Sequence, residues 1–161
     1  MDIKNFKNTS LIFFISLFIS YFINVIFFYS PQNIPFRNIQ INGLEVLKEI
    51  LFKNIICFIW ILLALILGKM VIAIFLIMNG AILGTFISKL SSIKYILAII
   101  PHGITEIFSF ILVCSIVLTV LENERLNLKN IKLIIFAFFI LIFSAILESF
   151  LTPMIIQKFV L

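Results

Sequence analysis

A histidine and a glutamate stand out in this sequence because an apolar segment surrounds both. His102 and Glu106 lie near the middle of the mostly apolar stretch Ser92–Leu121, and a spacing of four places them on one face of a helix. Hydrocarbon contains no water to solvate such groups, so each must be satisfied by protein or face a wet cavity. We therefore take this pair as the first candidate for a functional site.

A second glutamate lies inside the last apolar run. Glu148 falls within Leu133–Thr152, a run that we expect Pro153 to close. If the two helices pack together, this carboxylate can reach the same cavity as His102 and Glu106. The structural alternative is that His102 and Glu106 satisfy each other and fix the local backbone.

The residue types exclude several chemistries. A zinc site needs three or four protein ligands and this sequence holds one histidine, so we expect no metal and no other cofactor. A thiol–imidazole pair of Cys114 with His102 would have to bridge about 18 Å along one helix. Ser109 and Ser149 lack a nucleophile elbow. None of these sets is complete.

Three functions would use the cluster differently. An intramembrane peptidase or ligase would use His102, Glu106 and Glu148 as its catalytic groups. Proton-coupled transport would use them too, but secondary transporters are usually built from inverted repeats, and the sequence shows no repeat. No glycine-rich phosphate loop occurs, so a separate subunit must supply any energy from ATP. We favour a non-catalytic membrane subunit in which the cluster grips a peptide or a partner helix.

Composition places the chain in the bilayer. Of its 161 residues, 63% are hydrophobic and 12% are charged, with a mean hydropathy of +1.29, whereas a soluble domain carries about 25% charged residues. We expect one multi-pass domain, 1–161. The net charge is +5. The basic residues flank the apolar runs and nowhere form a run of four, which argues against nucleic-acid binding. Cys57 and Cys114 both lie in apolar runs and are predicted to be reduced.

The pattern predicts an all-α integral membrane protein with five spans, the fourth of them discontinuous. We expect a half-helix at Ile93–Ile100, a break at Pro101–Gly103, and a full helix from Ile104 to Leu121, because proline removes a ladder donor and glycine loosens the backbone. Gly68-Lys69 is so short that the second and third spans form a hairpin. The predicted spans are 10–29, 54–68, 70–88, 93–121 and 133–152.

The remaining segments are connectors. Gly43–Lys53 has leucines on one face and charges on the other, which predicts an amphipathic helix in the interface, with partner binding as the alternative. Residues 30–42 form a polar connector, 89–94 a basic one, and 122–132 a charged surface loop. Basic residues divide equally between the two predicted sides of the membrane. We place the N-terminus inside because the first helix usually dominates the orientation.

Small and polar residues in the spans predict helix contacts. Gly80 and Gly84 share one face of the third span and allow close backbone approach, and Asn79 can hydrogen-bond across that contact. Asn24 in the first span is predicted to bond to a neighbouring helix.

Three motifs in this order resemble the stage II sporulation protein M family. They are N-G-A-I-L-G at 79–84, P-H-G-I-T-E at 101–106 and A-I-L-E-S-F-L-T-P at 145–153. The resemblance covers roughly 54–153. The family's motif residues fall here on Asn79, Gly80, Gly84, Pro101, His102, Gly103, Glu106, Glu148 and Pro153.

The resemblance implies a multi-pass protein of a bacterial cell membrane. The founding type acts in forespore engulfment, in a complex with peptidoglycan-cleaving partners. Compact relatives occur in circular bacteriocin gene clusters, where they accompany an ATP-binding subunit and other membrane proteins in maturation, export or self-immunity. Because this chain is compact, with short connectors, the resemblance favours the bacteriocin setting, with a peptide as the substrate.

Overall fold

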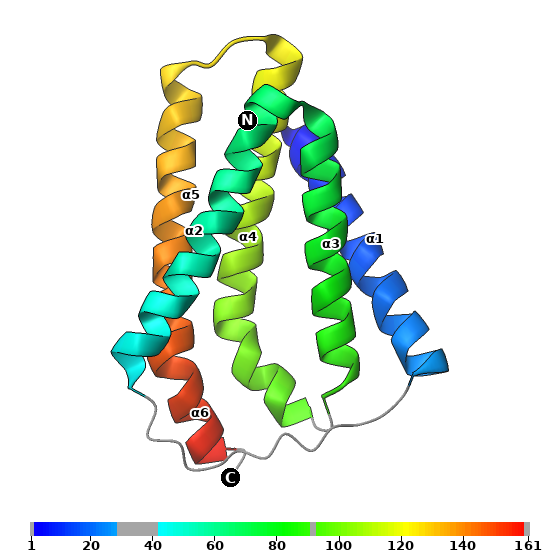
Figure 1. Cartoon of the computed structure of the whole chain (residues 1–161), viewed down its shortest axis with the longest axis vertical. Coiled ribbons are helices and arrows are strands. Elements are labelled where there is room, and N and C mark those ends of the chain that lie inside the picture. Colours follow the sequence, from blue (N-terminus) through cyan, green and yellow to red (C-terminus); the bar gives the residue numbers. More distant parts are fainter. Residues whose placement is uncertain (1, 29–41, 91–92, 160–161) are drawn as a thin grey trace.

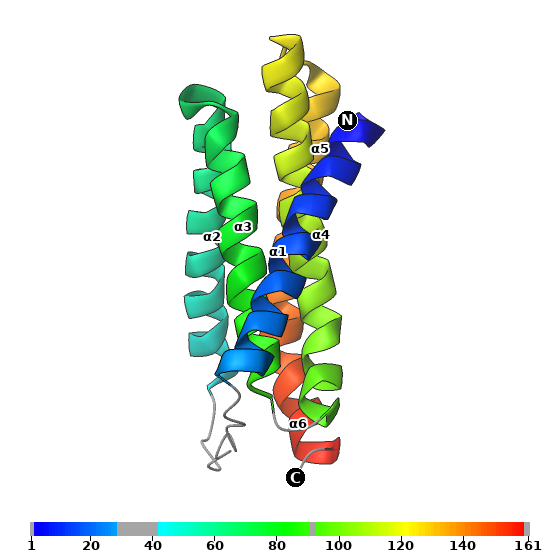
Figure 2. The same ribbon diagram turned by 90° about the vertical axis from the view of Figure 1, so that its right-hand side faces the viewer.

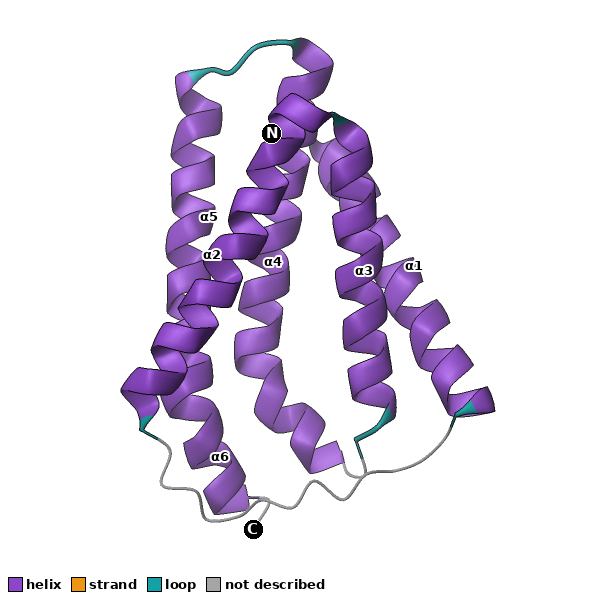
Figure 3. Cartoon of the chain, in the orientation of Figure 1, coloured by secondary structure: helices purple, strands orange, loops and turns teal. Residues whose placement is uncertain are grey.

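Five helical rods long and apolar enough to cross a membrane run up and down in this protein (Figure 1). The structure, a computed structural model, describes residues 2–28, 42–90 and 93–159. Within them it holds helices and short loops without a strand, which confirms the predicted all-α membrane fold (Figure 3). The helices are α1 (Ile3–Phe27), α2 (Gly43–Leu67), α3 (Lys69–Ser88), α4 (Ile93–Asn123), α5 (Leu128–Ile146), the π-helix η1 (Leu147–Leu151) and α6 (Thr152–Phe159).

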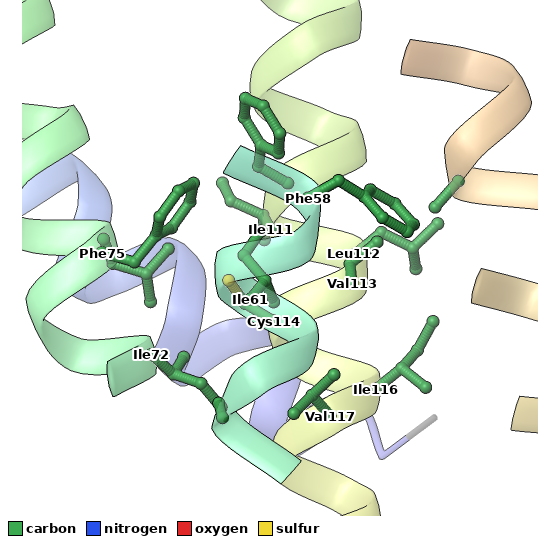
Figure 4. Close-up of a cluster of buried hydrophobic side chains, with 14 of the residues drawn as sticks. Phe58, Ile61, Ile72, Phe75, Ile111, Leu112, Val113, Cys114, Ile116 and Val117 are labelled. Carbon is green, nitrogen blue, oxygen red and sulfur yellow. The ribbon is translucent and has the colours of Figure 1, made fainter. Parts of the chain in front are cut away.

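Helix α4 is the centre of the bundle. Its side chains from Ile111 to Val117 are buried, and Val113 and Val117 are among those with no exposed surface. Figure 4 shows this stretch of α4 beside Phe58 and Ile61 of α2. Figure 2, turned by 90° from Figure 1, shows α1 crossing obliquely in front of α3 and α4. The central position of α4 fixes where its polar residues lie relative to every other helix.

Pro101 lies inside α4, and the helix continues through it. The predicted break at Pro101–Gly103 is therefore wrong. Proline removes one backbone donor, which kinks a membrane helix without ending it where nearby hydroxyls satisfy the carbonyls. Just after the proline, Thr105 Oγ1 donates to the carbonyls of Pro101 at 3.2 Å and of His102 at 2.8 Å, which adds hydrogen bonds to the turn that follows the kink. Figure 1 shows the first turns of α4 bending away from the axis of the rest.

The last span continues past Pro153, so the predicted end at this proline is wrong as well. The rod begins at Leu128, runs through η1, and continues as α6. In η1 the Thr152 N–H donates to the carbonyl of Leu147, five residues earlier. Pro153 has no N–H to donate one turn back, and the wider π-turn just before it lets the helix continue.

Helix α2 also differs from the prediction. Gly43–Lys53 forms the first turns of the spanning helix, so it is no separate interfacial helix. Its charges lie on the exposed side, where Lys53 Nζ pairs with Glu49 Oε1 at 2.7 Å. No proline or glycine separates Lys53 from Asn54, so nothing in the backbone ends the helix there. The predicted hairpin is confirmed, since Gly68, at φ +89°, is the single residue between α2 and α3.

Helices α1 and α3 meet at the two glycines of the third span. A Cβ at Gly80 would lie 2.5 Å from the carbonyl oxygen of Phe13, and one at Gly84 would collide with that of Leu17. The close backbone approach predicted from the glycine spacing is confirmed.

Hydroxyl and amide groups reinforce the same contact. Ser16 Oγ donates to the carbonyl of Ile77 at 2.6 Å. Ser20 Oγ donates to the carbonyl of Ala81 at 2.8 Å. Asn24 Nδ2 donates to Thr85 Oγ1 at 3.1 Å, which confirms the predicted bond to a neighbouring helix. In hydrocarbon such bonds have no water competing for them, so they hold α1 on α3.

The connectors divide between two ends. The N-terminus, the α2–α3 turn and the α4–α5 loop lie at one end, and the last turn of α6 lies at the other (Figure 1). The predicted loop 122–132 is shorter than expected, because α4 continues to Asn123 and α5 begins at Leu128. The predicted connector 30–42 lies almost entirely outside the described residues, as does the middle of 89–94.

Candidate functional site

His102 is held from the last span. Its imidazole Nδ1 lies 2.9 Å from Thr152 Oγ1, and the residue is 6% exposed. Among the described residues its ring makes no hydrogen bond to Glu106, so the alternative of a mutually satisfied pair is wrong. The kinked part of α4 and the start of α6 together fix this imidazole.

The two glutamates lie near each other. His102 and Thr152 touch across two helices that run in opposite directions, so Glu106, one turn after His102, and Glu148, one turn before Thr152, lie in the same layer. Lys53 of α2 acts electrostatically on Glu148. Both carboxylates are partly buried, and neither accepts a hydrogen bond from another described residue. The structure thus brings together His102, Glu106 and Glu148, which lie 46 residues apart in the sequence from first to last.

Serine hydroxyls hold the helices that carry the cluster. Ser144 Oγ of α5 donates to the carbonyl of His102 at 2.8 Å. Ser109 Oγ of α4 donates to the carbonyl of Ala137 at 2.7 Å. Each bond ties α4 to α5, so the cluster stands on a fixed two-helix frame. Sequence reasoning tested Ser109 as a nucleophile and did not predict this bridging role.

Asn79 lies in the same layer as Glu106. The rings of Phe75 in α3 and Phe110 in α4 meet edge to face, with centroids 5.4 Å apart. The two helices run in opposite directions, so four residues onward in α3 is Asn79, and four residues back in α4 is Glu106. Asn79 Nδ2 donates to the carbonyl of Phe75 in its own helix at 2.8 Å. The predicted bond across the glycine contact is therefore wrong, and Asn79 faces another groove.

This groove runs between α2 and α3. It has a volume of about 490 Å³, and Cys57 and Asn79 are among the residues that line it. Cys57 is close enough to Glu106 for the carboxylate to act on the thiol electrostatically. The apolar part of the wall includes Trp60, Ile74, Phe75, Met78 and Ile82.

Helix α2 contributes Asn54, a buried polar residue that the sequence analysis did not identify. Asn54 is 5% exposed, and its side-chain Nδ2 is buried without a hydrogen-bond partner among the described residues. It lies on the inward face of α2 with Phe58 and Ile61, between Lys53 and Cys57, which are neighbours of the two glutamates. The prediction of a separate helix ending at Lys53 hid this residue, although an asparagine in an apolar run is itself a signal.

The other motif residues shape the frame. Gly80 and Gly84 face α1, on the other side of α3 from the groove that Asn79 lines. Pro101 kinks α4, and Pro153 follows η1. A Cβ at Gly103 would lie 3.6 Å from Cγ2 of Ile99, an ordinary contact. These residues set helix geometry, while His102, Glu106 and Glu148 supply the ionisable groups.

The cluster contains acid–base groups but no nucleophile in a recognised arrangement. Ser109 and Ser149 both donate to backbone carbonyls, and Thr152 is the hydroxyl beside His102. Across the described parts of the chain, no three His, Cys, Asp or Glu side chains form a group that could hold a metal ion. The arrangement can bind a polar or charged group inside the membrane.

Fold and site together define a multi-pass helical membrane protein with an ionisable cluster within its bundle. The family model described as Stage II sporulation protein M matches residues 9–153. Because that match covers most of the 161 residues, the chain belongs to this family, and the resemblance inferred from the three motifs is confirmed. The search of curated proteins and the search of solved structures each gave no match.

Proposed function

We propose that this chain is a membrane subunit of a peptide-handling complex in a bacterial cell membrane. It acts with a separate ATP-binding subunit in the maturation, export or self-immunity of a circular bacteriocin. The observation that carries this proposal is the cluster of His102, Glu106 and Glu148 inside the bundle beside an apolar groove. Such a cluster is costly in a membrane and marks a functional site by default.

The geometry favours binding over catalysis. The serine hydroxyls near the cluster all donate to backbone carbonyls, Ser144 and Ser109 between helices and Ser149 within its own rod. Binding a peptide needs the apolar groove and a polar anchor, both of which are present. An ATP-binding subunit is proposed because the sequence has no phosphate-binding loop.

The test is purification from the cell that naturally encodes the protein. We expect the tagged chain, extracted in a mild detergent, to co-purify with an ATP-binding protein and at least one other membrane protein. A gene for a small hydrophobic precursor beside the genes of those partners would agree with this result. Recovery of the chain alone, from cells that express the neighbouring genes, would overturn the proposal.

An alternative is a scaffold for peptidoglycan-cleaving enzymes during sporulation engulfment. The family description itself favours it. Deletion of the gene should then arrest engulfment, and the tagged chain should co-purify with peptidoglycan-cleaving enzymes. Normal engulfment in the deletion strain removes this alternative.

A second alternative is an intramembrane peptidase or ligase. The contact of 2.9 Å between His102 Nδ1 and Thr152 Oγ1 favours it, because an imidazole can activate a hydroxyl. The double variant His102→Ala with Glu106→Gln should abolish processing while the precursor still binds and the complex still assembles. Full processing in that variant excludes the enzyme, and loss of precursor binding indicates a binding site.

A further inference from the structure

We propose that Glu106 and Glu148 bind a cationic group of an apolar peptide, an ammonium or a guanidinium, and that the peptide lies in the groove between α2 and α3. This inference rests on the proposed peptide-handling function and names the feature of the peptide that the site recognises.

Charge is the first argument. Two carboxylates from different helices are near enough to repel each other, and no described residue donates a hydrogen bond to either. Among the described side chains, Lys53 is the cation that acts on Glu148, and its ammonium already pairs with Glu49 at 2.7 Å on the exposed side of α2. Carboxylates inside a membrane protein need a partner, so a cation complements this pair.

Asn54 supplies an independent argument. Its Nδ2 is buried and has no acceptor among the described residues, which leaves a donor unsatisfied one helical turn before Cys57 of the groove wall. A buried donor without an acceptor costs about 1–3 kcal/mol. A peptide carbonyl supplies the missing acceptor, whereas a simple cation does not. The combination of two acceptors for a cation and one donor for a carbonyl fits a peptide.

The groove provides the apolar part of the site. Its volume of about 490 Å³ and its wall of aromatic and aliphatic side chains suit several apolar side chains of a peptide. Trp60 and Met78 are exposed at the groove, on the surface that faces lipid in a membrane. Neither glutamate is part of the groove wall, so the cationic side chain of the peptide must extend inward past Cys57, on which Glu106 acts, and past Asn79, which lies in the layer of Glu106.

The experiment uses the full chain in nanodiscs of uncharged lipid. The probes are a fluorescent apolar helical peptide with one central lysine and the same peptide with leucine at that position. We expect the lysine peptide to bind about tenfold more tightly than the leucine peptide, because a charge pair at low dielectric contributes at least that much. Empty nanodiscs measure the partition of each peptide into lipid.

Matched variants locate the binding. The preference for lysine should disappear in Glu106→Gln and in Glu148→Gln and should persist in Glu45→Gln, where the same change falls on an exposed carboxylate of α2. Asn54→Leu should weaken both peptides alike. Equal binding of the two peptides by the native chain, as expected if the carboxylates share a proton, would overturn the proposal. Unchanged preference in both glutamine variants would do the same.

Cys57 provides a second readout that needs no variant. It is half-buried in the groove, whereas Cys114 has no exposed surface and serves as the internal control. The lysine peptide should slow alkylation of Cys57 by a maleimide, and the leucine peptide should slow it less.

Two further results would contradict the proposal. They are protection of Cys57 by calcium alone, which indicates a metal site, and protection by an amine-headed lipid alone, which indicates a lipid site. If the lysine preference is absent while the ATP-binding partner still co-purifies, this inference fails and the proposed function stands.

Discussion

Gly84 is a residue at which α1 and α3 pack backbone against backbone. Its position leaves no room for a Cβ, because the carbonyl oxygen of Leu17 and the backbone nitrogen of Tyr21, at 3.0 Å, already occupy that space. Backbone atoms cannot rotate away as a flexible side chain can. The α1–α3 contact therefore depends on the absence of a methyl group at this position.

Gly84→Ala should lower the free energy of unfolding by about 1–3 kcal/mol, the usual cost of forcing a group into a filled contact. The measurement is unfolding in mixed micelles of increasing sodium dodecyl sulfate. Gly103→Ala is the matched control, because its Cβ would meet an ordinary contact at 3.6 Å within a helix, where alanine is the better helix former. Equal destabilisation of both variants would show that the helix contact is not the cause.

Asn5 makes a second connection that the sequence did not reveal. It is 1% exposed, and its Nδ2 donates to Glu122 Oε2 at 2.6 Å and to Thr119 Oγ1 at 3.2 Å. These bonds join the start of α1 to the end of α4. The predicted first span begins at residue 10, so Asn5 falls outside it and nothing in the sequence marks it as different from Asn8, which is exposed.

Asn5→Ala should lower the free energy of unfolding by about 1–3 kcal/mol, because Glu122 and Thr119 lose a buried partner. Asn8→Ala should change it little, since surface substitutions away from special features are usually small in effect. The same micelle titration compares the two. A loss at Asn8 that matched the loss at Asn5 would contradict the role given to the buried amide.

At the scale of elements, the length of the apolar runs predicted the spans well. The prolines and polar residues that interrupt those runs predicted the helix ends badly. The glycine spacing in α3 and the single-residue hairpin turn at Gly68 were predictable because each depends on local geometry. Whether the helix continues through Pro101 and Pro153 depends on other helices and on a π-turn. No local sequence pattern contains that information. Proline alone therefore overpredicted helix ends.

The sequence predicted the candidate site residues on α4 and η1, but it did not predict those on α2. His102, Glu106 and Glu148 are ionisable residues in apolar runs, so composition alone marks them. Asn54 and Lys53 join them because α2 is one long helix, whereas the amphipathic pattern of its first turns equally suits an interfacial helix. The pairing of α2 with α4 and η1 is tertiary information.

Continuity of α2 is testable by hydrogen exchange. Backbone amides on both sides of the Lys53–Asn54 bond should exchange slowly, because each is bonded within one helix. The loop Glu124–Asn127 should exchange quickly in the same sample and provides the comparison. The measurement is deuterium uptake by mass spectrometry in nanodiscs. Fast uptake centred on Lys53, at the rate of the loop, would restore two separate helices.

At the scale of the whole molecule, an odd number of spans fixes the relation between the two ends of the chain. The described residues hold five helices long and apolar enough to cross a membrane, and the start of α1 and the end of α6 lie at opposite ends of the bundle (Figure 1). The site lies on the α6 side of the Phe75–Phe110 contact. The cluster is consequently nearer the membrane face that carries the C-terminus.

This arrangement predicts the accessibility of terminal tags. With Lys4 and Lys7 ahead of α1 holding the N-terminus inside, an N-terminal tag should resist protease added to intact cells from which any outer layers have been removed. A C-terminal tag should be cleaved under the same conditions, and inverted vesicles should reverse both results. Cleavage of both tags from one side would contradict five spans. Exact reversal of the expected pattern would retain five spans and overturn the orientation, which would place the peptide site nearer the inner face.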